Sequence, residues 1–256
     1  AYKGIASSYS NLSNDSEERK YLQKALDLID RVSDREQYLI QGDFYWQIEE
    51  TYDKAIKAYT KLVKLYPDDE VANINLAILY RDLDEWDKSA ERFEVLKMTG
   101  AKSIFIYMNL AIVYWYKGDY EKAGEVLERY LNNISDNVLI NGLLAYNYLF
   151  QERYDRALVE VDKAISLDPT IYRNLYIKGD IYHIKGDLIQ AEREYQKLIE
   201  TGEKAAELEA RDKLGALYLM QGKFDKSVDQ LKKGIELATE LGEQSDKSRF
   251  QLKLAY

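Results

Sequence analysis

The amino-acid sequence predicts an all-α fold built from repeated helical hairpins, and two observations carry this prediction. A small residue recurs every 34 positions, with a last step of 36, at Ala55, Ser89, Ala123, Ala157, Ala191 and Ser227. The chain has only 2 prolines among 256 residues, and Pro67 and Pro169 lie 102 positions apart, three times the same period. A fixed period of this length is typical of stacked helical repeats, and scarce prolines leave long helices uninterrupted.

The first helix of each unit is predicted from two further series. A tyrosine stands nine or ten positions before each small residue, at Tyr45, Tyr80, Tyr114, Tyr148, Tyr182 and Tyr218. Another small residue lies three positions before each tyrosine, at Gly42, Ala77, Ala111, Ala145, Gly179 and Gly215. Positions three or four apart share one face of a helix, so each unit begins with a helix whose small face allows close packing.

The second helix is predicted from a bulky residue three positions before the recurring small one. These bulky residues are Tyr52, Trp86, Tyr120, Tyr154, Leu188 and Phe224. Glycine-centred breakers separate the two helices at 117–119, 185–187 and 221–223. Because glycine readily ends a helix, each unit is predicted to be an antiparallel helix pair.

We expect one solenoid domain over residues 1–256. Six units fill 35–242, a degenerate unit fills 1–34, and 243–256 form a terminal helix or a truncated repeat. Ser33 and Glu36 have the spacing of a capping box that opens the first full unit. Both ends of the sequence fall inside predicted helices, which favours a piece of a longer protein; the alternative is that 245–256 is a polar capping helix.

This pattern resembles the tetratricopeptide repeat, a helix-turn-helix unit of 34 residues. The resemblance implies a right-handed α-α superhelix that acts as a protein-interaction scaffold. The usual tryptophan of the first helix is absent, and its place is taken by Tyr38, Asn73, Tyr107, Asn141, Leu175 and Arg211. Residues 32–42 also resemble the segment that links such repeats to bacterial serine/threonine kinases and adenylate cyclases.

Composition argues against catalysis and against several kinds of ligand. The chain has no cysteine and a single histidine, His183, so thiol chemistry and Cys/His metal sites are excluded. We predict no catalytic residue, no metal and no cofactor. The formal net charge of −9 disfavours nucleic acid as a partner. No apolar run is long enough for membrane insertion and no signal peptide is evident, so a cytoplasmic location is expected.

The resemblance implies that particular positions of each first helix line a concave groove. From these positions we predict a groove that is apolar and aromatic at its centre and binds a peptide or helical segment of a partner. Its predicted residues are Ile74, Ile78, Arg81, Phe105, Met108, Ile112, Trp115, Tyr116, Tyr146, Leu149, Phe150, Arg173, Tyr176, Asp180 and His183. His183 is interpreted as a packing or rim residue, although Asp180, three residues earlier on the same helix face, could pair with it.

Three functions remain open at this point. The first is a scaffold that holds a partner segment in the groove. The second is a sensory or regulatory segment of a larger bacterial signalling enzyme, such as a serine/threonine kinase. The third is self-association through uncapped repeat ends, because a solenoid repeat buries its apolar face only against a neighbour. The carboxylate clamp of one subset of the family needs lysine and asparagine at positions that here carry other residues, so chaperone tails are disfavoured.

Overall fold

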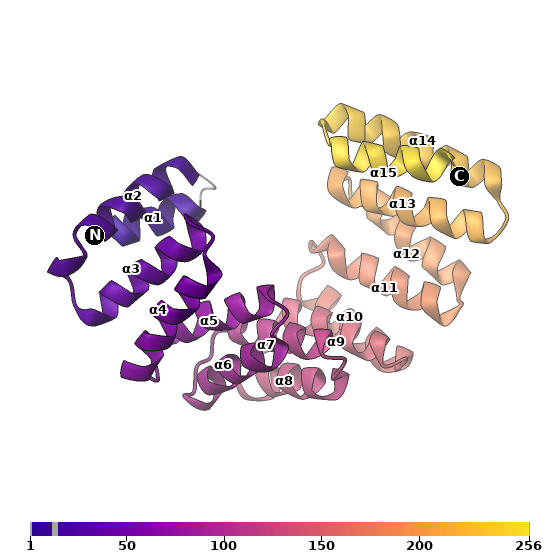
Figure 1. Cartoon of the computed structure of the whole chain (residues 1–256). Coiled ribbons are helices and arrows are strands. Elements are labelled where there is room, and N and C mark those ends of the chain that lie inside the picture. The colour runs from indigo at the N-terminus through magenta and orange to yellow at the C-terminus, as the bar shows by residue number, and fades with distance from the viewer. Residues whose placement is uncertain (1, 12–14, 256) are drawn as a thin grey trace. The chain divides into compact units, whose positions relative to one another are not determined.

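The computed structural model describes residues 2–11 and 15–255. Its regular elements in these ranges are fifteen α-helices and one short 3-10 helix, with no strand among them, which confirms the all-α prediction (Figure 1). The chain divides into two compact units, Ala1–Val126 and Leu127–Tyr256, and the division falls within one helix. We describe each unit by itself, and the single-solenoid arrangement of 1–256 stays a prediction.

The first unit holds the helices up to the dividing one. They are α1 (Tyr2–Asn11), α2 (Asp15–Asp27), η1 (Ile29–Arg31), α3 (Asp34–Gln47), α4 (Tyr52–Leu65), α5 (Glu70–Asp82), α6 (Trp86–Met98) and α7 (Ile104–Tyr116), followed by α8 (Tyr120–Asn133), which spans the division. Each helix from α1 to α6 packs against the next α-helix in the chain. The capping box is present, because the Ser33 hydroxyl accepts from the Glu36 backbone N–H and the Glu36 carboxylate accepts from that of Ser33.

The second unit continues the same pattern. It contains α9 (Val138–Phe150), α10 (Tyr154–Leu167), α11 (Tyr172–Lys185), α12 (Leu188–Glu200), α13 (Lys204–Met220), α14 (Phe224–Leu241) and α15 (Gln244–Ala255). Consecutive helices pack against each other, and α11 also contacts α9 and α13. The first helices of three successive repeats therefore lie side by side in this unit.

The recurring small residues lie where the two helices of a hairpin approach most closely. The four alanines from Ala55 to Ala191 in this series are fully buried. Where serine replaces alanine, its hydroxyl donates to a carbonyl of the opposite helix: Ser89 Oγ to Ala77 O at 2.7 Å, and Ser227 Oγ to Gly215 O at 2.8 Å. The serine hydroxyl is thus hydrogen-bonded within the core, as a buried polar atom requires.

The turns within the hairpins use a left-handed residue, as the glycine breakers predict. Gly118, Gly186 and Gly222 have φ values of 73°, 87° and 70°. The other hairpin turns place Glu50, Asp84 and Glu152 in the same region, with φ values between 52° and 59°. These three turns have no glycine at the left-handed position, so the glycine breakers did not predict them. A side chain strains the backbone at such a position.

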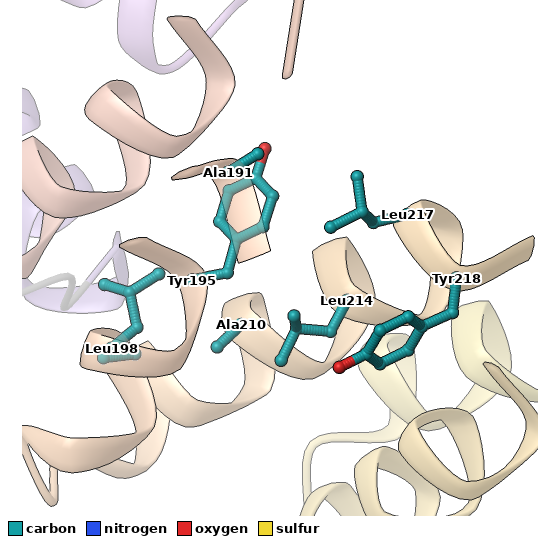
Figure 2. Close-up of a cluster of buried hydrophobic side chains, with 8 residues drawn as sticks. Ala191, Tyr195, Leu198, Ala210, Leu214, Leu217 and Tyr218 are labelled. Atoms are coloured by element: carbon teal, nitrogen blue, oxygen red, sulfur yellow. The ribbon is translucent and has the colours of Figure 1, made fainter. Parts of the chain in front are cut away.

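A cluster of buried side chains joins α12 to α13 in the second unit (Figure 2). It consists of Ala191, Tyr195, Leu198, Ala206, Ala210, Leu214, Leu217 and Tyr218. Tyr195 and Leu198 of α12 belong to this cluster together with the small residues Ala206 and Ala210 of α13. This cluster fixes α13 beside α12 and so places the polar side chains of α13 described below.

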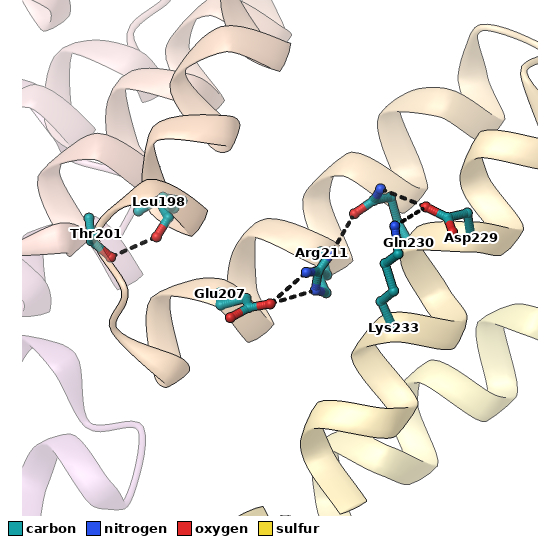
Figure 3. Close-up of polar contacts among 7 residues, drawn as sticks. All are labelled: Leu198, Thr201, Glu207, Arg211, Asp229, Gln230 and Lys233. Atoms are coloured by element: carbon teal, nitrogen blue, oxygen red, sulfur yellow. Dashed lines mark hydrogen bonds and ion pairs between the residues drawn. The ribbon is translucent and has the colours of Figure 1, made fainter. Parts of the chain in front are cut away.

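The last full repeat replaces the usual aromatic residue of the first helix with an arginine. Arg211 forms an ion pair with Glu207 one turn earlier, at 2.5 Å, and its Nη1 donates to Gln230 Oε1 of α14 at 2.9 Å (Figure 3). The Arg211 side chain is largely buried, and its guanidinium is hydrogen-bonded to Glu207 and Gln230. A polar link between α13 and α14 therefore takes the place of ring packing.

Candidate functional site

In the first unit, the predicted groove residues lie on α5 and α7. Ile74, Ile78 and Arg81 belong to α5, and Phe105, Met108, Ile112, Trp115 and Tyr116 belong to α7. Phe105 is 41% exposed, and Tyr116 is exposed, whereas the other six are half-buried. Arg81 Nη1 donates to Asn109 Oδ1 at 2.7 Å, which ties α5 to α7.

Tyr116 has a partner that sequence reasoning did not find. Its ring stacks on Trp86 at the start of α6, with centroids 4.6 Å apart and planes 9° apart. Offset-stacked aromatic pairs add stability beyond the area that they bury. Tyr116 therefore braces α6 against α7, and we leave it out of the surface proposed below.

In the second unit, the predicted residues lie on α9 and α11. Phe150 is 52% exposed at the end of α9, and its ring stacks with that of Tyr146, with centroids 6.3 Å apart. Leu149 is only 6% exposed and belongs to the core, because α9 turns it away from solvent. It therefore cannot contribute the groove contact that its position in the repeat predicts.

Asp180 is the centre of a polar cluster that joins three helices. Its carboxylate accepts a hydrogen bond from the Tyr195 hydroxyl of α12 at 2.6 Å and forms an ion pair with Lys213 Nζ of α13 at 2.9 Å. The same ammonium lies 4.4 Å from the ring centroid of Tyr176, within cation–π range. Two predicted residues, Tyr176 and Asp180, thus meet two residues that the prediction missed, Tyr195 and Lys213.

The pKa values in this cluster follow from burial and the Asp180 charge. Burial and the neighbouring carboxylate raise the pKa of Tyr195 far above its ordinary value, so this phenol stays protonated. Burial opposes the charge of Lys213, but the ion pair with Asp180 outweighs it, and the pKa of Lys213 is raised. Burial also raises the pKa of Tyr146, although a hydrogen bond with Arg173 opposes this shift. In this cluster the phenol and the ammonium are donors, and the Asp180 carboxylate is the acceptor.

Gly179 allows this arrangement to form. A Cβ atom at this position would lie 2.4 Å from the Tyr195 ring, far inside contact distance. The small position of the repeat is therefore glycine here because a tyrosine ring from α12 lies directly against the α11 backbone. The pair of Gly179 with a tyrosine 16 residues later is the sequence signal that identifies the cluster.

The first unit contains an equivalent cluster around Asp43 of α3. Tyr59 of α4 donates to Asp43 Oδ1 at 2.5 Å, and its ring occupies the space beside Gly42, where a Cβ would lie 2.3 Å away. Asn75 of α5 donates to the Tyr59 hydroxyl at 3.0 Å, and Lys3 of α1 forms an ion pair with Asp43 at 2.9 Å.

His183 makes a different contact from the pairing with Asp180 that the sequence allows. Its Nε2 lies 3.2 Å from the Met220 Sδ of α13, while the carboxylate of Asp180 is engaged by Tyr195 and Lys213. The pairing with Asp180 is therefore not formed, because the stronger ionic and hydroxyl partners hold that carboxylate. His183 instead helps to join the ends of α11 and α13.

The described residues offer little to a metal ion. Within 2–11 and 15–255, no group of three or more histidine, aspartate or glutamate side chains is placed to hold one. Over the same residues, no helix has both the length and the apolar character required to cross a bilayer.

A family model of the tetratricopeptide repeat matches residues 106–137, 140–171 and 172–201, and a second model of the same repeat matches residues 38–69. These segments coincide with the helix pairs α7–α8, α9–α10, α11–α12 and α3–α4. The chain carries tetratricopeptide repeats. The resemblance drawn from the 34-residue period is thereby confirmed.

Related proteins support the tetratricopeptide assignment. The chain is 28% identical over 95 residues to a TPR repeat-containing protein of Methanocaldococcus jannaschii; the match covers 37% of this chain and 16% of that protein, about a sixth of its length. A tetratricopeptide repeat protein from Parabacteroides merdae has a TM-score of 0.71 at 15% identity, covering 99% of this chain and 96% of that chain. The MamA protein has a TM-score of 0.59 at 23% identity, with 68% and 94% covered. At these low sequence identities, the structural likeness shows the shared fold alone.

Proposed function

We propose that this chain is a protein-interaction scaffold, and that the exposed face of α9, α11 and α13 binds an extended or helical segment of a partner protein. Tetratricopeptide repeats support the general role. The observation that carries the specific one is the row of half-buried and exposed side chains on three adjacent first helices. We define this α9–α13 face by Tyr146, Phe150, Arg173, Tyr176 and Glu209.

The α9–α13 face has the chemistry of a peptide site. Phe150 offers a rigid aromatic anchor, and such residues bury much apolar area for little lost entropy. Tyr172, Arg173, Tyr176 and Glu209 surround a shallow recess of about 280 Å³ between α11 and α13. The Asp180 cluster beneath it fixes the positions of Tyr176 and Lys213, so the face is ordered before a partner arrives.

The same features argue that the face binds and does not catalyse. The pKa values of the buried phenol and of the ion-paired lysine are both raised, so neither group has the lowered pKa that a general base would need. A partner segment with an apolar residue for Phe150 and an acidic residue for Arg173 fits this face best. In the first unit, exposed Phe105 gives α7 a similar anchor.

Capture of partners from a lysate of the source cells tests this proposal. Immobilised chain should retain a specific protein, identified by mass spectrometry, and Phe150→Ala and Tyr176→Ala should each reduce its recovery at least about tenfold. Ile189→Ala is the matched control, because Ile189 is 80% exposed on α12, away from the first helices. Equal recovery with all three variants would contradict the proposed face.

Two alternatives from the sequence remain proposals with simple tests. Attachment to a signalling enzyme is decided by the coding sequence on either side of these 256 residues, where a kinase or cyclase domain would support it. Self-association is favoured by exposed apolar side chains at the end of the second unit, among them Met220 and Phe224. A concentration-dependent mass in sedimentation would support it, and a constant monomer mass would exclude it.

A further inference from the structure

We propose that a recess bordered by α13, α14 and α15 binds a single apolar aromatic side chain, of phenylalanine chemistry, from a partner protein. The recess has a volume of about 310 Å³. Ala216 and Leu219 of α13, Leu231 of α14 and Leu252 of α15 line it. It is separate from the α9–α13 face, and it does not depend on the function proposed for that face.

The preceding repeat shows what occupies the equivalent space. There, Gly179 of the first helix is covered by the ring of Tyr195 from the second helix. In the last full repeat, Gly215 takes the place of Gly179, and Leu231, 16 residues later, takes the place of Tyr195. Leu231 reaches the glycine, since a Cβ there would lie 3.0 Å from Leu231 Cδ2, but leucine has no ring to extend beyond it. The chain thus fills this site with an aromatic ring in one repeat and leaves a hollow in the next.

The polar environment determines which ring fits. Ala216 stands where the preceding repeat has Asp180, so a tyrosine hydroxyl in the recess would lose its acceptor. The hydroxyl of Ser227, which also lines the recess, already donates to Gly215 O at 2.8 Å. Lys253, the one charged residue of the lining, is held by Asp212 at 2.6 Å. Because these polar groups are already satisfied, an occupant without a polar tip is favoured.

The rim of the recess consists of apolar side chains that are exposed to water. Leu219 is 53% exposed and Leu252 is 61% exposed, although both are large aliphatic residues. An inserted ring would contact both side chains and displace water that the apolar lining cannot hydrogen bond. A single anchor that enters such a pocket is a common centre of binding energy in protein interfaces.

Side-chain analogues test the recess without any knowledge of the partner. Toluene represents phenylalanine and p-cresol represents tyrosine, and each is titrated into the full chain while amide chemical shifts are followed by NMR. We expect toluene to shift the amide signals of Gly215, Leu219 and Leu252 in a saturable manner, and p-cresol to bind several-fold more weakly. Absence of saturable shifts at these residues, or equal affinity for both probes, would overturn the proposal.

Variants provide the control. Ala216→Asp combined with Leu231→Tyr recreates the Asp180–Tyr195 pair and should weaken toluene binding at least about tenfold, because the new ring fills the recess. Leu252→Ala removes most of an exposed side chain at the rim and should weaken toluene binding without altering the core. This variant tests the proposal even if the double variant fails to fold. Met98→Ala, at an exposed residue of α6, should leave binding unchanged. Binding that persists in both α13–α15 variants would place the probe elsewhere and contradict the proposal.

Discussion

Asp43 in the first unit and Asp180 in the second occupy equivalent places in their repeats, yet different helices supply the cation that neutralises them. Both carboxylates follow a glycine and accept from a tyrosine of the second helix. Asp43 pairs with Lys3 of the preceding repeat, while Asn75 of the following repeat donates to its tyrosine. Asp180 pairs with Lys213 of the following repeat. The glycine, aspartate and tyrosine form a constant element, and the cation is the variable part.

The two clusters also differ in how far they are open to a partner. Asp43 is buried, whereas Asp180 is half-buried, and its partner Lys213 lies over the ring of Tyr176, which lines the recess. The same arrangement is therefore buried in the first unit and adjoins the proposed binding face in the second. Four predictions test or sharpen this difference, beginning with the largest expected effect.

The glycine should be the most sensitive position of each cluster. Gly179→Ala places a Cβ 2.4 Å from the Tyr195 ring, and this overpacking should lower the free energy of unfolding by about 2–3 kcal/mol, more than the ~1 kcal/mol that alanine gains in a helix. Urea denaturation measures the change. Combining it with Tyr195→Leu, the residue type found opposite Gly215, should recover part of the loss. No recovery would show that the ring is not the cause.

Removal of the cation should separate the two clusters. Lys213→Ala leaves Asp180 with only the Tyr195 hydroxyl among these partners and should cost about 2 kcal/mol. Lys3→Ala should cost about 1 kcal/mol, because the amide of Asn75 also lies 3.3 Å from Asp43 Oδ1. Hydrogen exchange of the α3 and α11 amides measures each effect locally. Equal losses would show that Asn75 does not compensate for the missing charge.

Alkaline pH should weaken both clusters through their tyrosines. Burial raises the pKa of Tyr59 and of Tyr195 above that of an unfolded tyrosine, so each contributes stability below pH ~10 that is lost as the pH rises further. Each such phenol steepens the decline of the unfolding free energy by about 1.4 kcal/mol per pH unit. Denaturation at pH values of about 9 to 12, around the tyrosine pKa, measures this decline. The unfolding free energy of Tyr195→Phe should fall less steeply with pH than that of the unchanged protein. Burial and Glu128 raise the pKa of Tyr148 to about 12. Tyr148 therefore contributes equally to the pH dependence of the unchanged protein and of Tyr195→Phe.

The turns after α3 and α11 give the smallest contrast. The first has Glu50 at φ 52°, and the second has Gly186 at φ 87°. Glu50→Gly should stabilise the first unit by up to about 1 kcal/mol, and Gly186→Ala should destabilise the second by a similar amount, because only glycine adopts this region without strain. Thermal denaturation measures both. A change of the same sign in the two variants would mean that contacts of Glu50 outweigh its backbone strain.

The fold was accessible from the sequence because its signals are local and repeated. A period of 34, small residues at each close approach and breakers between helices are sufficient to place the helix pairs from α3 to α14. The division at Val126 was not predicted, because every repeat carries the same local pattern and none marks a boundary between compact units.

The site was only partly accessible. Tyr176 and Asp180 were predicted from their position in the repeat, but Lys213 and Tyr195 come from neighbouring helices whose facing side chains depend on packing. Leu149 and Tyr116 occupy groove positions in the repeat, yet one is buried and the other stacks on Trp86. Position within a repeat predicts the direction of a side chain, whereas its use depends on what the adjacent helix presents.

Gly179 and Tyr195 belong to the same hairpin, as do Gly42 and Tyr59. Gly234, in contrast, makes room for Phe250, which belongs to the next helix pair. A hairpin of the first kind carries both halves of this contact within one repeat. A hairpin of the second kind shares this contact with its successor, so α14 and α15 depend on each other for it.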